Sequence, residues 1–503
     1  MEGGVIMFVY TKAMSMKRLS GCLILLAGVL ICLVPLPLGA SEQVSSFLYA
    51  NFEPFALYCD GKSEATMEVA TRGRDLELVT AEVHRSPVDF EKVLVDGKKT
   101  SRMYDDGTHG DRKANDGVYT VRFGQNDYNA APYSTTSAGL YFIKKGARKS
   151  ADSGYYAQDP LVEHIDSGSY GTVNTATHFP LIKLAENLFA TPYAVFLVDK
   201  DRKIFPNFPL DNFVCFETKF IKAATKALYS AFPDSFDYVT VMPGGTIYTP
   251  AVVNSWGYGE NVPYFVSVKQ DVRNIGLPRI DHTRDYGSKG RLQGVIYHSF
   301  GTGEILDHEI GHNWGISYGS KFGLVPKDDV HWSANTDLWD QMTLYFFSNG
   351  SAVHFRRKDD TDFTAITNLS EKDENNPGYD DLTLYLMGLI PPEQVRPVHI
   401  LIDPVFAAPD QVSYKQVKTV TIDQLLKAEG RREPAYPNTQ REFNMAFVII
   451  TTHEPTDAEA AFYSLIAKYL GSGEKARKYL IPFQTATRGK AILNTKLPGI
   501  AGE

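Results

Sequence analysis

The chain has 503 residues and a formal net charge of −8, with 43% hydrophobic and 12% aromatic residues. This length exceeds one ordinary domain, so two or three domains with sizeable cores are expected. The charge is spread along the chain without a basic patch. Composition therefore argues against nucleic acid as a partner.

The first forty residues have the pattern of a signal peptide. Lys17 and Arg18 precede an apolar run over 23–36, and small residues ending at Ala40 precede a polar stretch. This predicts a signal peptide over 1–40, with an uncleaved membrane anchor as the alternative. We expect export to the cell envelope or beyond, with no stable membrane insertion after signal removal.

Two of the four cysteines lie within this segment, so cleavage leaves Cys59 and Cys215. They either form one disulfide or pack separately as buried thiols, and their number is too small for a disulfide framework.

Residues 41–150 predict an antiparallel β-sandwich. Short alternating segments, "ATMEVATRG", "DLELVTAEVHR", "GVYTVRFG" and "GLYFIKKG", are separated by Gly and Asp clusters, which is the spacing of sandwich strands. A Ser-, Gly- and Tyr-rich stretch over 151–175 then predicts a linker.

One loop of this domain, "YDDGTHGDRKANDGVYT" at 104–120, resembles loops of immunoglobulin-like modules. Its carboxylates offer oxygen ligands for Ca²⁺, while Asp-Gly pairs are also what tight turns need without a metal. The candidate calcium ligands are Asp105, Asp106, Asp111 and Asp116.

Residues 176–503 predict an α+β domain that includes a C-terminal α/β subdomain. Its expected elements are strands 193–198, 237–243, 264–268 and 294–299, a helix over 215–232, and later a helix over 378–390, a strand near 442–452 and a helix over 457–471. The strand at 294–299 leads into a stretch rich in chemically active side chains.

That stretch is "GEILDHEIGHNWGISYG", residues 303–319. On a helix, His308 and His312 lie on one face and can offer nitrogens to a single ion, with Glu309 beside them. Gly315 can end the helix in a left-handed turn. A surface helix whose histidines bind nothing is the alternative.

A catalytic zinc needs three protein ligands and one open position, where water falls to a pKa of roughly 7. Glu309 would then act as the general base that takes a proton from this water.

The segment "HEIGHNWG" resembles the zinc helix of zincin metallopeptidases, and His-Glu-x-x-His-x-x-Gly is how the metzincin branch begins. Metzincins place a third ligand three residues after the glycine, where this chain has Tyr318. Tyr318 is therefore expected to pack or to donate a hydrogen bond in the transition state. Met342 is the candidate counterpart of the metzincin methionine turn, or else a core methionine.

The third zinc ligand must lie further along the chain. In "KDDVHWSANTDLWDQMTLYF", His331 is the choice, because imidazole suits zinc and nineteen residues allow the chain to return under the helix. Asp340 is the reserve candidate for the third ligand. The alternative is that His331 is an ordinary core or surface histidine.

The segments "HWS…DxxDQM" and "YLMGLIPPEQV", with the sandwich ahead, resemble poorly characterised secreted bacterial proteins that carry HExxH and an immunoglobulin-like domain. The resemblance implies a secreted zinc endopeptidase acting on a protein or peptide. Two rivals remain: a non-catalytic surface binding module with a degenerate or structural zinc site, and a zinc hydrolase acting on a non-peptide amide.

Overall fold

The computed structural model describes residues 47–71, 76–83, 91–124, 132–201, 203–204, 218–244, 263–298, 306–314, 317–326, 330–338, 340–343, 346–348, 351–357, 363–367, 378–408, 411–477 and 480–500. The predicted signal segment, Cys215 and Gly315 lie outside these residues, whereas Cys59 is buried. Within the described part of the chain, no helix is long and apolar enough to cross a membrane.

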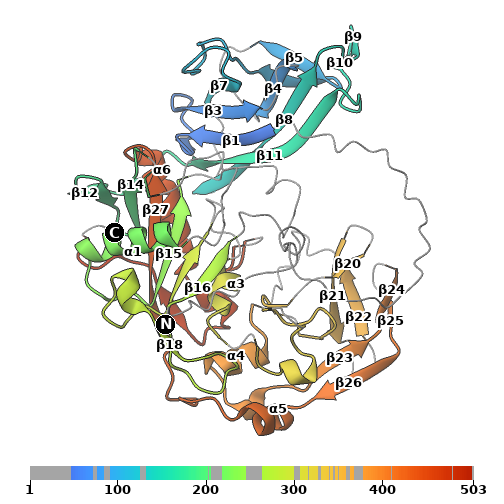
Figure 1. The fold of residues 1–503 in the computed structure, drawn as a ribbon, viewed down its shortest axis with the longest axis vertical. Helices are drawn as coiled ribbons and strands as arrows, with labels where there is room; N and C mark the ends of the chain where they lie inside the picture. The colour runs from blue at the N-terminus through green and yellow to red at the C-terminus, as the bar shows by residue number, and fades with distance from the viewer. Residues whose placement is uncertain are drawn as a thin grey trace, which may run out of the picture.

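The N-terminal domain is formed by two β-sheets (Figure 1). The first has the order β1-β3-β7, with β1 Phe47–Glu53, β3 Glu64–Thr71 and β7 Val118–Gly124. The second has the order β2-β11-β8-β4-β6-β5-β10-β9, with β2 Ala56–Tyr58, β11 Val162–Val173, β8 Tyr133–Lys144, β4 Leu76–Val83, β6 Lys98–Arg102, β5 Lys92–Val95, β10 Gly154–Tyr155 and β9 Lys149–Ser150.

The two sheets share one apolar interior because alternate side chains of each strand point inward. Phe47 of β1 meets Phe142 of β8 with ring centroids 5.9 Å apart. Phe52 of β1 lies 5.5 Å from the ring of Tyr170 on β11. Most pairings are antiparallel, as predicted, but β11 pairs with β2 and β10 with β5 in parallel.

The stretch 151–175, predicted to be a linker, is instead part of this domain. It contains β11, which pairs antiparallel with β8 from Val162–Ile143 to Val173–Tyr133. A register shift between Asp166 and Ser169 accommodates the glycine- and serine-rich centre of the strand. The glycine and serine content of this stretch is typical of a loop. Pairing with β8 nevertheless stabilises it as a strand.

The second domain is built on a mixed sheet with the order β12-β13-β14-β27-β15-β19-β16, with β28 beside β27. Strands β14, β27, β15 and β19 are parallel, and β16 runs antiparallel at the edge. The bounds are β12 Ile182–Ala185, β13 Leu188–Ala190, β14 Ala194–Val198, β15 Tyr238–Pro243, β16 Tyr264–Ser267, β19 Gly294–Tyr297, β27 Glu442–Thr451 and β28 Ile492–Asn494.

Helices cover both faces of this sheet, so its central strands are apolar throughout. Along β14, Val195 and Leu197 face the helix α1 (Lys219–Ala231), and Ala194, Phe196 and Val198 face the opposite core. That opposite core also contains α3 (Leu306–Gly311) and α6 (Asp457–Leu470). The predicted strands and helices of this domain are confirmed within about four residues at each described end.

Helix α6 also joins the two domains. Its Phe462 lies between Phe55 and Tyr133 of the N-terminal domain, with ring centroids 5.6 and 5.8 Å away. A Cβ added at Gly171 of β11 would lie 2.7 Å from the Phe462 ring, so the strand backbone rests on this side chain. One continuous apolar core therefore runs from the sandwich to the sheet of the second domain.

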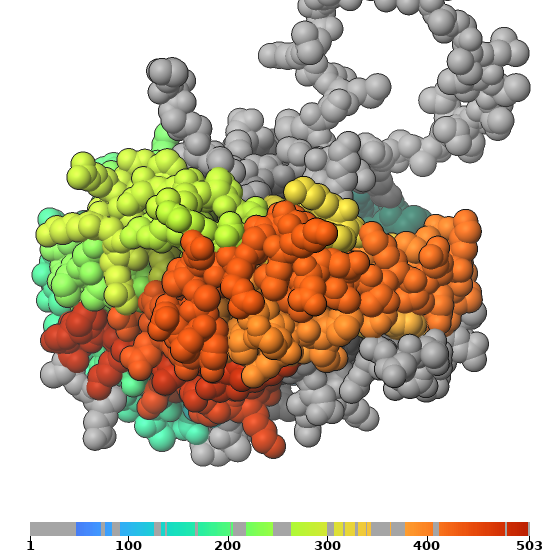
Figure 2. All heavy atoms as spheres, turned by 90° about the horizontal axis from the view of Figure 1, so that it is seen from below, coloured from blue at the N-terminus to red at the C-terminus, as the bar shows by residue number. Residues whose placement is uncertain are grey.

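The remaining segments form short elements around the second domain. They are β17 Lys269–Gln270, β18 Ile280–Asp281, β20 Phe346–Ser348, β21 Ser351–Arg357, β22 Phe363–Thr367, α4 Asp381–Met387, β23 Val398–Ile402, β24 Val405–Ala408, β25 Gln411–Ser413, β26 Gln416–Val420, α5 Ile422–Glu429 and α7 Phe483–Ala486. Seen from below, the 263–298 segment lies beside segments from the last quarter of the chain (Figure 2). The protein is thus a β-rich, multi-sheet, multidomain chain.

Candidate metal centre

The HExxH segment forms a short helix. α3 spans six residues, and His312, Asn313 and Trp314 follow in a tighter turn whose N–H groups donate to the carbonyls three residues back, at 3.3, 3.0 and 3.1 Å. A helix this short is marginal by itself. Its geometry therefore depends on contacts with the rest of the domain.

Three histidines meet at this helix. His308, His312 and His331 each lie 5.0 Å from the other two, measured between ring centroids. Their ligating atoms fall within 4.8 Å of one another. Nε2 of His308 and Nε2 of His331 are 3.1 Å apart, and two nitrogens on one tetrahedral zinc lie roughly 3.3 Å apart when each bond is about 2.0–2.1 Å. The spacing fits a single ion.

His308 is oriented by a backbone carbonyl. Its Nδ1 donates to the carbonyl oxygen of Gln341 at 2.6 Å, since a carbonyl can only accept. The proton of the neutral ring therefore lies on Nδ1, and Nε2 presents a lone pair toward His331. Such a bond from the second ring nitrogen is what fixes the tautomer of a metal-ligating histidine.

His331 is held by the loop that returns beneath α3. The neighbouring Trp332 donates from its backbone N–H to the carbonyl of Met342 at 2.8 Å, and its Nε1 donates to Thr383 at 2.9 Å. Met342 in turn packs against α3, because a Cβ added at Gly311 would lie 2.3 Å from Met342 Sδ. One turn thus supports both the helix and the third histidine.

Glu309 lies beside the histidines with a carboxylate oxygen unpaired. It is 4% exposed, and its Oε2 is 3.9 Å from Nε2 of His312 without a hydrogen-bond partner. Burial, and then the charge of Asp307, raise the pKa of Glu309 to about 8. A nearby dication favours the ionised carboxylate and opposes this shift.

Burial acts on the histidines in the opposite direction. It lowers the pKa of His308 to about 3 and the pKa of His312 well below its usual value, and the neighbouring imidazoles add to both shifts. Both rings are therefore neutral at pH 7, which is the form that binds metal. The donor set and the orphaned Glu309 oxygen fit a zinc site with an adjacent base.

Asp340, the reserve candidate for third ligand, has a different position. Its carboxylate accepts from the backbone N–H groups of Met342 at 2.7 Å and Asp380 at 2.6 Å. Asp340 thus braces the loop that carries His331, and it is His331 that completes the cluster among the described residues. Asp340 is therefore not part of the three-histidine cluster in this structure.

Tyr318, considered as a transition-state donor, is fully buried. Its hydroxyl donates to the carbonyl of Gly430 at 3.5 Å, just past the end of α5, and its ring lies 6.4 Å from that of Tyr385. Burial raises the pKa of this phenol above its usual range. These contacts place Tyr318 in a packing role.

The predicted calcium loop brings Asp105, Asp111 and Asp116 together, with carboxylate oxygens within 4.8 Å. These carboxylates also accept backbone N–H groups of the same loop, including Gly107 to Asp111 at 2.6 Å and Asp116 to Asp105 at 3.0 Å. The fourth candidate, Asp106, accepts from Thr108. Turn chemistry accounts for these contacts, and calcium binding stays a prediction.

Sequence reasoning missed the Gln341 carbonyl, because a backbone acceptor has no side-chain signature. Comparisons with known proteins add nothing to this picture, since no family model, no curated protein and no solved structure matches the chain. The function is therefore inferred from the site itself.

Proposed function

We propose that this protein is an exported zinc-dependent endopeptidase with an immunoglobulin-like N-terminal domain and a zincin-like catalytic domain. The observation that carries the proposal is the convergence of His308, His312 and His331 beside an unpaired, buried Glu309 oxygen. The HExxH motif by itself covers only a few residues. His331, 19 positions after His312, adds the third nitrogen donor that a catalytic zinc site requires.

The residues have separate roles in this proposal. His308, His312 and His331 hold the ion. When bound, zinc supplies Lewis acidity, which brings the pKa of water to roughly 7 and polarises a carbonyl. Glu309 takes the proton from the attacking water through Oε2 and then delivers a proton to the leaving amine. Burial of this carboxylate keeps the proton transfer away from bulk solvent.

The number of ligands favours an enzyme over a structural zinc module. Structural zinc sites are closed by four protein ligands, whereas catalytic sites use three and keep one position open. The cluster in the described residues contains three histidines and no fourth His, Cys, Asp or Glu donor. Three imidazoles are also a ligand set found in catalytic zinc sites.

The wider context supports a peptidase. The resemblance of "HEIGHNWG" to zincin helices is joined by Met342, the candidate methionine-turn residue, which packs against Gly311. The predicted signal peptide supports an activity outside the cytoplasm. The resemblance to metallopeptidases favours peptide bonds as the substrate class.

The test is zinc-dependent cleavage of a mixed peptide library by the purified protein, read by mass spectrometry. Cleavage should stop when zinc is chelated, return when zinc is added, and be absent in His308→Ala. Zinc binding without cleavage of any library peptide would contradict the peptidase assignment. Cleavage that persists in the chelated protein would contradict the role of the metal.

A further inference from the structure

The three histidines of the candidate site are not supported in the same way. His308 has the Gln341 carbonyl, and His331 is fixed by the bonds of Trp332. Among the described contacts, His312 has ring neighbours and the 3.9 Å approach of Glu309, and no hydrogen bond orients its imidazole. Its direction must therefore be set by its backbone.

The residue that fixes this backbone is Asn313. Its side chain is 3% exposed, and its Nδ2 donates to the hydroxyl of Tyr238 at 2.8 Å and to Oε1 of Gln293 at 3.1 Å. Its carbonyl accepts from Nε2 of Gln270 at 2.8 Å. Three separate segments of the domain thus hold the residue that directly follows His312.

Two of these partners are themselves immobilised. Tyr238 begins β15 and is fully buried, and Gln293 lies just before β19. Nε2 of Gln293 donates to Asp237 at 3.1 Å and to Oε1 of Gln440 at 2.9 Å. The chain of bonds therefore passes from the turn after α3 to the edge of the sheet where the parallel strands begin.

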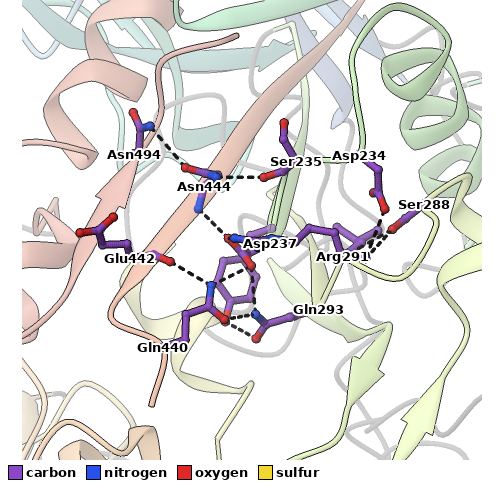
Figure 3. Close-up of polar contacts among 12 residues, drawn as sticks. Asp234, Ser235, Asp237, Ser288, Arg291, Gln293, Gln440, Glu442, Asn444 and Asn494 are labelled. Carbon is purple, nitrogen blue, oxygen red and sulfur yellow. Dashed lines mark hydrogen bonds and ion pairs between the residues drawn. The ribbon is translucent and has the colours of Figure 1, made fainter. Parts of the chain in front are cut away.

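The chain of bonds ends on an ion pair between the buried Asp237 and the exposed Arg291, both labelled in Figure 3. Asp237 is 1% exposed and accepts from Arg291 at 2.8 Å, from Gln440 at 2.8 Å and from the backbone N–H of Asn444 at 2.8 Å. A hollow of about 610 Å³ opens over Arg291, Gln440 and Asn444. Arg291, Gln440 and Asn444 all donate hydrogen bonds to Asp237. We call these four residues the Asp237 anchor, because their mutual bonds fix the end of the chain of bonds from Asn313.

We propose that Asn313 is a positioning residue, which aims the His312 imidazole at the metal by tying the end of α3 to the Asp237 anchor. The inference rests on the proposed function, because it concerns the same zinc site. A short helix followed by a tight turn can rotate at its end, and loss of the Asn313 bonds frees that rotation. Mutation of residues that orient metal ligands typically weakens metal affinity by about 10- to 100-fold.

The experiment is a competitive zinc titration of the full chain, with cobalt(II) absorption as a second readout of coordination. Asn313→Ala and the isosteric Asn313→Asp, which removes the Nδ2 donors, should both weaken zinc binding by about tenfold or more. Both should also lower the visible absorption of the cobalt form. Tyr238→Phe, which removes one partner, should have a smaller effect in the same direction.

Ser464→Ala is the matched control. Ser464 is fully buried and its hydroxyl lies 2.7 Å from that of Thr191, in the same domain and outside the metal site. The control should lose stability and keep the zinc affinity and cobalt spectrum of the wild type. It separates a general loss of packing from a loss of ligand direction.

The outcomes distinguish the two proposals. Wild-type protein that binds no zinc would overturn the proposed function and this inference with it. Wild-type protein that binds zinc, with both Asn313 variants binding as tightly and giving the same cobalt spectrum, would overturn the positioning role alone. If Asn313→Ala does not fold, Asn313→Asp and Tyr238→Phe decide the question.

Discussion

Two buried glutamates of this protein, Glu309 and Glu459, have opposite surroundings. Glu459 on α6 is fully buried, and its carboxylate accepts from the backbone N–H of Phe55 at 2.9 Å, from Thr456 at 3.0 and 3.1 Å, and from His453 at 2.9 Å. Glu309 on α3 is nearly as buried, and its Oε2 has no hydrogen-bond partner.

The difference separates a structural carboxylate from a functional one. Glu459 completes the capping box of α6 and bonds to the sandwich domain at Phe55, so its bonds stabilise the domain junction. A buried carboxylate without donors costs free energy unless a ligand or reaction uses it. Glu309 keeps such an oxygen next to three histidines, and this is where chemistry is expected.

The largest effect should come from exchanging the two carboxylates for amides. Glu309→Gln removes the base and keeps the ligands, so peptide turnover should fall by about 10²-fold or more while zinc stays bound. Glu459→Gln should leave turnover per folded molecule close to wild type. Steady-state kinetics with bound zinc measured in parallel provides the check, and wild-type turnover in Glu309→Gln would refute the role of Glu309.

The same pair should behave in the reverse way in unfolding experiments. Glu459→Ala leaves the Phe55 and Thr456 donors unpaired in a buried site, so the free energy of unfolding should drop by about 3–5 kcal/mol. Glu309→Ala removes no described hydrogen bond to Oε2, and should cost much less in the metal-free protein. Denaturant titration measures both, and equal losses would remove the distinction.

A smaller effect is expected at the contact between α3 and the Met342 turn. Gly311→Ala would bring a Cβ to 2.3 Å from Met342 Sδ, and relief of this overlap should cost about 1–3 kcal/mol and weaken zinc binding. Gly473→Ala is the control, because its new Cβ would meet the flexible Gln484 side chain at 3.0 Å. Unchanged stability and zinc affinity in Gly311→Ala would show that the turn does not support the helix.

The smallest effect is a pH dependence at the domain junction. Burial by itself lowers the pKa of His453, but the bond and charge of Glu459 and the charge of Glu53 outweigh it, so the net shift is upward. Since the folded pKa exceeds the unfolded value, this stabilisation is complete below about pH 6.5 and is lost as the pH rises through the folded pKa. His453→Gln should flatten this part of the unfolding free energy above about pH 6.5, and identical profiles would contradict the linkage.

Much of the fold could be predicted because its signals are local. Period-two patterns located the sandwich strands, and the apolar stripe of "CFETKFIKAATKALYSAF" located α1. The linker prediction failed at β11, because the glycine and serine content of "VEHIDSGSYGTV" is typical of loops. Its pairing with β8 is a tertiary effect that composition does not encode.

The site could be predicted only where the types and spacing of side chains indicate metal binding. The spacing of His308 and His312 places them on one face of a helix, and the missing ligand at Tyr318 directed the search to His331. The Gln341 carbonyl and the Asn313 network could not be predicted in this way. One is a backbone group, and the other includes bonds between residues up to 207 positions apart in sequence.

The three-histidine metal site can be tested by measuring zinc binding to the wild type, His331→Ala and His399→Ala. His399 is the matched control, because it is buried, bonds to Asp337 at 2.9 Å and lies outside the cluster. We expect one zinc per chain in the wild type and in His399→Ala, and zinc affinity at least about 10²-fold weaker in His331→Ala, on the order of the loss caused by removing one of three ligands. Wild-type zinc affinity in His331→Ala would contradict the three-histidine site.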